Sequence, residues 1–126
     1  MDWQLDKSQL ATLVAYDDGT TSLYFSSGGG RIGAGSLASV QMAAERFREG
    51  FAEVDAFFHA VEQWPPPSRG SCVFYAVDRQ LTRATAHVAG AKIRSRDHPL
   101  HGLATRAQDL ITAIRKAKPI AGPGGA

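Results

Sequence analysis

A regular spacing of apolar residues predicts one long helix in the middle of the chain. Apolar side chains recur at alternating intervals of three and four, which places them on one stripe of an α-helix. The stripe consists of Leu37, Val40, Ala44, Phe47, Phe51, Val54, Phe58 and Val61. We predict a helix from Ser36 to Gln63, which would be roughly 42 Å long at about 1.5 Å per residue. Such a helix forms the spine of the domain or projects from it to meet a partner.

The residues around this stretch set the expected ends of the helix. Ser36 is suited to the N-cap, because its hydroxyl oxygen can accept a hydrogen bond from an unpaired backbone N–H of the first turn. The run from Trp64 to Pro67 ends the helix, since proline cannot continue it. Gly50 interrupts the helix and marks a kink or a close contact with a neighbouring element.

Alternating residues predict a β-hairpin before the helix. Residues 11–16 and 20–26 form its strands, and Asp18-Gly19 forms its turn because both positions tolerate positive φ. The glycine-rich stretch that follows forms a further turn, with room for a short strand over residues 31–34.

The second half of the chain repeats this order. Residues 71–77 and 81–89 predict two strands, and the first is expected to be central because both of its faces are largely apolar. Residues 91–96 extend the sheet, and a closing helix begins near Asp97. The apolar stripe of that helix consists of Leu103, Ala107, Leu110, Ile114 and Ala117.

This order of elements, ββαββα, predicts an α+β fold. We expect a two-layer sandwich, in which two helices cover one face of an antiparallel sheet of four to five strands. The length of 126 residues fits a single domain over residues 1–126. Within it, residues 1–10 are expected to form an N-terminal arm and residues 119–126 a flexible tail.

Composition points to a reducing compartment. The single cysteine, Cys72, excludes an internal disulfide, and its apolar strand predicts a small buried hydrophobe rather than a nucleophile. The polar, acid-containing N-terminal segment does not resemble a signal peptide, and no apolar run reaches transmembrane length. We therefore expect a cytoplasmic protein that makes no membrane contact.

A glycine-rich loop is the candidate anion site. Residues 28–33 match the pattern G-x-G-x-x-G before a helix, and backbone amides at such a place attract phosphate. The preceding strand belongs to a hairpin and no Lys-Ser/Thr follows, which argues against dinucleotide binding and excludes a P-loop. A purely structural turn remains the alternative. The candidate residues are Gly28, Gly29, Gly30, Arg31, Gly33 and Ser36.

Basic residues gather in the second half and offer a candidate nucleic-acid site. Residues 69–126 contain ten basic and three acidic residues, whereas residues 1–68 contain four basic and nine acidic ones. Lys92, Arg94 and Arg96 alternate, so in a strand they face one way, and Arg83 can join them. No aromatic residue is interleaved with them, and a solvated edge strand explains the same pattern.

No cluster typical of catalysis or of metal binding stands out. His98 and His101 are three apart, but Pro99 and Gly102 interrupt the helix there and no third ligand is evident. We therefore predict no catalytic residues, no metal and no cofactor. The first hypothesis is a non-catalytic interaction module that forms a homodimer. The alternatives are a small anion- or nucleotide-binding protein or enzyme that uses the glycine-rich loop, and a nucleic-acid-binding protein.

The order of elements resembles the roadblock/LC7 class of profilin-like domains. The features that carry the resemblance are the Asp18-Gly19 hairpin, the long helix after it, the second hairpin and the closing helix. The resemblance implies a dimerising adaptor without catalysis, often one that regulates a small GTPase. For the interface of the homodimer we predict Met42, Phe51, Val54, Phe57 and Phe58.

Overall fold

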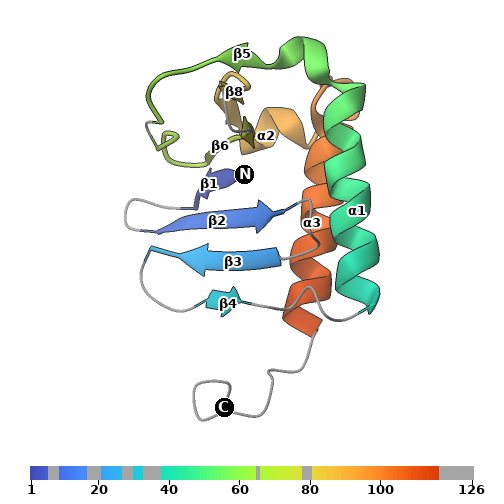
Figure 1. Ribbon diagram of the computed structural model, residues 1–126. Coiled ribbons are helices and arrows are strands. Elements are labelled where there is room, and N and C mark those ends of the chain that lie inside the picture. The colour runs from blue at the N-terminus through green and yellow to red at the C-terminus, as the bar shows by residue number, and fades with distance from the viewer. Residues whose placement is uncertain are drawn as a thin grey trace.

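The chain adopts an α+β fold, and its described residues form two antiparallel sheets and two long helices (Figure 1). The computed structural model describes residues 1–5, 9–16, 21–26, 30–32, 38–64, 66–77 and 81–116, with only the backbone described for residues 30–32. The predicted tail, residues 119–126, lies outside them.

The larger sheet has six strands among the described residues, in the order β4-β3-β2-β1-β6-β9. Their bounds are Asp2–Gln4 (β1), Leu10–Ala15 (β2), Thr21–Phe25 (β3), Gly30–Ile32 (β4), Ser71–Val73 (β6) and Val88–Ala89 (β9). Leu13 lies opposite Leu23 and Trp3 lies opposite Cys72, so these four side chains share one face. The short strand β4 falls close to the one predicted over residues 31–34.

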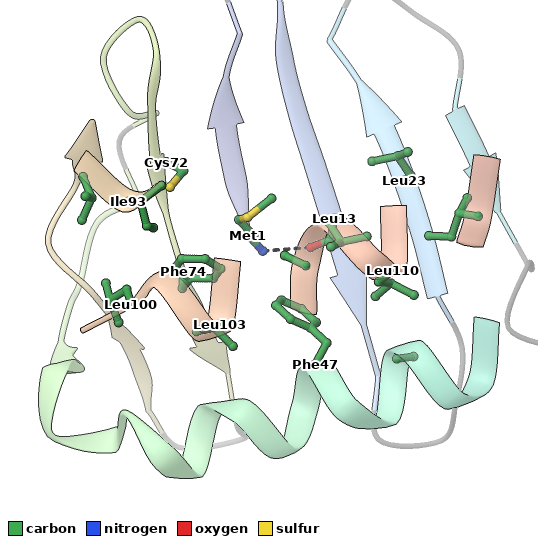
Figure 2. Close-up of a cluster of buried hydrophobic side chains, with 14 of the residues drawn as sticks. Met1, Leu13, Leu23, Phe47, Cys72, Phe74, Ile93, Leu100, Leu103 and Leu110 are labelled. Atoms are coloured by element: carbon green, nitrogen blue, oxygen red, sulfur yellow. Dashed lines mark hydrogen bonds between the residues drawn. The ribbon is translucent and has the colours of Figure 1, made fainter. Parts of the chain in front are cut away.

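The two long helices cover that face of the larger sheet. Helix α1 spans Ala38–Glu53 and helix α3 spans His101–Lys116. Figure 2 shows Leu13 and Leu23 of the sheet directed toward Phe47 of α1 and Leu110 of α3. All four side chains are at most 2% exposed, so the core lies between the sheet and the helices. The predicted apolar stripe of α3 is confirmed within the described residues, because Leu103, Ala107, Leu110 and Ile114 are all buried.

A smaller three-stranded sheet, which we call the small sheet, has the order β5-β8-β7. Its strands are His59–Ala60 (β5), Tyr75–Val77 (β7) and Thr82–Ala84 (β8). The 3-10 turn η2 (Asp55–Phe57) leads into β5, and the short helix α2 (Gly90–Ile93) follows β9. Among the described residues, no helix combines the length and the apolar character needed to cross a bilayer.

The prediction of an N-terminal arm is wrong for its first residues. Strand β1 lies inside the larger sheet, between β2 and β6. The Met1 α-amino group donates a hydrogen bond to the Leu13 carbonyl oxygen at 2.8 Å (Figure 2). The Leu13 N–H donates to the Met1 carbonyl oxygen at 2.9 Å. Met1 and Trp3 alternate with Asp2 and Gln4, but a pattern this short is too weak to predict a strand.

The long helix is shorter than predicted. Helix α1 ends at Glu53, which makes it roughly 24 Å long at about 1.5 Å per residue. The residues that follow it, which were predicted to continue the helix, include η2 and β5. Phe58 nevertheless reaches the same cluster as the helical residues, because its ring centroid lies 5.4 Å from that of Phe51. A β-branched residue followed by aromatic ones, as in Val54 to Phe58, has a lower helix propensity than the preceding turns.

Both predicted strands of the second half are divided between the two sheets. Residues 71–77 supply β6 and β7, and residues 81–89 supply β8 and β9. The division occurs at Phe74 and Thr85: the Phe74 N–H donates to the Thr85 hydroxyl at 3.1 Å, and the Thr85 N–H donates to the Phe74 carbonyl at 3.0 Å. Phe74 is fully buried there. The expected sheet of four to five strands is therefore a six-stranded sheet with a second sheet beside it.

Gly50 marks a close contact between the two long helices. A Cβ atom at this position would lie 3.1 Å from Leu103 Cδ1 and 3.1 Å from Arg106 Cδ. Arg106 also donates to the Arg46 carbonyl oxygen at 2.9 Å and pairs with Glu53 at 3.2 Å. The missing side chain of Gly50 thus lets α3 approach α1, and one arginine joins the two helices.

Candidate functional site

Little of the predicted anion site is within the described structure. Gly28, Gly29, Gly33 and Ser36 lie outside the described residues. Gly30 and Arg31 belong to β4, where their backbones pair with β3 opposite Tyr24 and Leu23. The role of the glycine-rich loop therefore stays a prediction.

The predicted basic strand is wrong. Lys92 lies in α2, and Arg94 and Arg96 follow it in turns, so strand alternation does not place the three on one face. Arg83 belongs to the small sheet, where its guanidinium pairs with Asp55 at 2.7 Å and lies 6.0 Å from the ring centroid of Phe58. The four basic residues occupy different elements, and the geometric argument for a shared nucleic-acid site does not hold.

The predicted interface residues divide into buried and exposed groups. Phe58 is only 7% exposed and belongs to the core. Phe51 and Val54 are half-buried and pack against the core, where the Phe51 ring contacts those of Phe47, Phe58 and Phe74. Met42 on α1 and Phe57 on η2 are exposed by 67% and 43%. The apolar stripe of α1 is thus largely used inside this chain.

One face of the small sheet is directed away from the core and carries both apolar and polar residues. Paired residues share a face, so Val61, Thr82 and Val77 form one row and His59, Ala84 and Tyr75 form the next. The opposite face carries Ala60, Arg83 and Ala76. Ala76 packs against the core, to which Phe58 and Phe74, the residues directly before β5 and β7, also belong. We call the first face, together with Trp64, the outer face of the small sheet.

Two aromatic rings stack on this outer face. The ring centroids of Trp64 and Tyr75 are 5.2 Å apart and their planes differ by 17°. Burial, and in smaller measure the charge of Asp2, raises the pKa of the Tyr75 hydroxyl. Beside the rings lies a shallow hollow of about 460 Å³, whose lining includes Val61, Ala84 and His87. The strand pattern predicts a single sheet and therefore gives no sign of this surface.

A second hollow lies between α3, α2 and the strands β1 and β6. It has a volume of about 380 Å³, and we call it the α3 pocket. Cys72 lies at its inner wall and is 3% exposed, which confirms the predicted buried cysteine. Burial raises the pKa of the Cys72 thiol to about 11, so the thiol is protonated at neutral pH.

Both predicted histidine candidates take part in local hydrogen bonds. His98 Nδ1 accepts from the Leu100 N–H at 3.1 Å, and His101 Nδ1 lies 2.9 Å from the Ile93 carbonyl oxygen. In the described part of the chain, no three His, Cys, Asp or Glu side chains are grouped as metal ligands.

Comparison of the chain with protein-family models, with curated proteins and with solved structures found no match. The resemblance to the roadblock/LC7 class therefore stays a prediction.

Proposed function

We propose that this protein is a non-catalytic interaction module of the reducing cytoplasm, and that it forms a homodimer through the outer face of the small sheet. The observation that carries the proposal is the exposure of large apolar side chains on that face. On the outer face, Trp64 and Val77 are exposed by 52% and 62%. Phe57 in η2 and Leu81, which precedes β8, are exposed by 43% and 46% but are not part of that face. Contiguous exposed apolar surface is characteristic of protein interfaces, and aromatic residues are enriched at their centres.

The alternative surface for a homodimer is α1. Its exposed side, however, carries Glu45, Arg46 and Glu49 around Met42, while its aromatic residues point into the core. Charged residues are depleted at the centres of interfaces. The small sheet is therefore the better candidate.

The chemistry of the described residues is consistent with a role in binding rather than catalysis. Cys72 is buried and protonated, and His98 and His101 both make hydrogen bonds to backbone groups. A dimer without catalysis is also what the resemblance to the roadblock/LC7 class implies. Regulation of a small GTPase remains part of that resemblance only.

The test is the mass of the chain by light scattering at micromolar concentration. We expect a dimer for the native chain and a dimer at least about tenfold weaker for Val77→Lys, because a charge would be buried at the interface. Met42→Lys is the matched control, since it also replaces an exposed apolar residue. It should leave the dimer intact.

Two results would overturn the proposal. A native chain that stays monomeric would remove the homodimer altogether. Dissociation by Met42→Lys but not by Val77→Lys would move the interface from the small sheet to α1.

A further inference from the structure

The α3 pocket combines an apolar interior with a polar rim. Trp3, Cys72, Ile93 and Ala104 supply apolar surface from four different elements. Figure 2 shows Cys72 and Ile93 close together at this end of the core. A volume of about 380 Å³ lies within the range of small-molecule sites, which are typically roughly 300–1,000 Å³.

The rim along α3 offers hydrogen-bond acceptors. A carbonyl oxygen cannot donate, so His101 Nδ1 carries the hydrogen of its 2.9 Å contact with the Ile93 carbonyl oxygen. Nε2 of the neutral ring is then an acceptor. Thr105 Oγ1 lies 3.5 Å from this Nε2, but its hydroxyl donates to the His101 carbonyl oxygen at 3.0 Å. His101 Nε2 therefore retains its lone pair for a donor from the pocket.

The rim also carries two charges of opposite sign. Arg94 stands at the α2 end, and Asp109 lies two turns along α3 from His101. Within the described ranges, neither side chain forms an ion pair, with the other or with any third residue. A ligand that carries both a carboxylate and an ammonium group would complement this pair of charges.

We propose that the α3 pocket binds a small zwitterion with an apolar body, such as an apolar amino acid. The carboxylate pairs with Arg94, and the ammonium group donates to His101 Nε2 and the Asp109 carboxylate. The apolar body fills the space between Trp3, Cys72 and Ala104. This site is separate from the outer face of the small sheet, so either proposal can fail without the other.

Trp3 provides a direct reporter of this site. The chain has two tryptophans, and Trp64→Phe leaves Trp3 as the only one while keeping a ring beside Tyr75. We would titrate this variant with phenylalanine, 3-phenylpropionate and phenethylamine, and follow tryptophan fluorescence. Phenylalanine should give a saturable change with a Kd of about 1 mM or tighter. Each analogue lacks one of the two charges and should bind about tenfold more weakly.

Variants in the same Trp64→Phe background assign the contacts. Arg94→Gln should weaken phenylalanine binding about tenfold without altering phenethylamine binding. Arg96→Gln is the matched control, because this neighbouring arginine is exposed and does not line the pocket. Ala104→Phe should fill the pocket and abolish binding. If Ala104→Phe fails to fold, the contrast between Arg94→Gln and Arg96→Gln decides.

Three outcomes would overturn the proposal. The first is no saturable change in Trp3 fluorescence with phenylalanine up to about 10 mM, a concentration well above the expected Kd. The second is 3-phenylpropionate or phenethylamine binding as tightly as phenylalanine. The third is an equal effect of Arg94→Gln and Arg96→Gln.

Discussion

Apolar side chains are buried on the helix-covered face of the larger sheet, whereas several are exposed on the outer face of the small sheet. Between the larger sheet and its helices, Leu13, Leu23 and Phe47 are each 2% exposed. On the small sheet, Val77 and Trp64 are exposed by 62% and 52%. Apolar alternation in a strand indicates which residues share a face, but it does not show whether another element covers that face. Here α1 and α3 cover one sheet, whereas Ala84 alone is buried among the paired residues on the outer face of the other.

The largest expected effect compares two phenylalanines. Phe47→Ala should lower the free energy of unfolding by about 3–5 kcal/mol, because it leaves a cavity beside Phe51 and Phe74. Phe57→Ala removes the same side chain from a 43% exposed site and should cost less than about 1 kcal/mol. Urea unfolding measures both. Equal losses would show that the two regions are not distinguished by burial.

The next effect is the pH dependence of folding stability, which arises from Met1 on the helix-covered face of the larger sheet. Burial lowers the pKa of the Met1 α-amino group from 8.0 to about 6, against a smaller raising effect of Asp2. Between these values the unfolded chain binds more protons than the folded chain, so stability should rise from pH 6 to pH 8. The gain should approach roughly 2–3 kcal/mol, at about 1.4 kcal/mol per pKa unit.

The Met1 titration can be observed directly. Met42→Leu leaves Met1 as the only methionine, so a ¹³C-methionine label then reports this residue alone. Its NMR signal should titrate near pH 6 in the folded chain. Titration near pH 8 would contradict the buried amine.

A smaller effect tests the contact between the helices that cover the larger sheet. Gly50→Ala places a methyl group 3.1 Å from Leu103 and Arg106. Overpacking should lower the free energy of unfolding by about 1–3 kcal/mol, which exceeds the gain of about 1 kcal/mol from higher helix propensity. Gly102→Ala in α3 meets nothing within 4 Å and should stabilise the chain. Thermal unfolding should therefore shift in opposite directions. Two shifts of the same sign would show that the helices do not depend on Gly50 for their approach.

The smallest effect lies on the outer face of the small sheet. Trp64→Leu removes the stacking on Tyr75 but keeps an apolar side chain, and should cost about 0.5–1.5 kcal/mol. Chemical unfolding, measured at a concentration low enough to avoid self-association, reports this loss. A loss as large as that of Phe47→Ala would mean that Trp64 belongs to the core.

The sequence predicted the α+β class and the apolar stripe of α3, because both rest on long regular patterns. It placed the end of α1 wrongly, since spacing alone does not distinguish a continuing helix from a turn that returns Phe58 to the same cluster. It missed β1 because the strand is three residues long. It also missed the division at Phe74, because alternation continues unchanged while the backbone pairs with different neighbours.

The candidate sites were harder to predict than the fold. Lys92, Arg94 and Arg96 alternate in sequence, but their segment forms α2 and the turns after it. The α3 pocket joins Trp3, Cys72 and His101, which are distant in the chain and meet only through strand pairing and helix packing. Neighbouring residues carry no signal for such a site.

The position of β1 has a consequence for the order of folding. Strand β1 pairs with β2 on one side, but its other edge pairs with β6, which follows only after α1. During synthesis that edge of β1 has no strand to pair with until the second half of the chain emerges from the ribosome. Contacts of such sequence separation slow folding, and an unpaired edge strand invites association with other nascent chains. The larger sheet is thus completed late, from two segments made at different times.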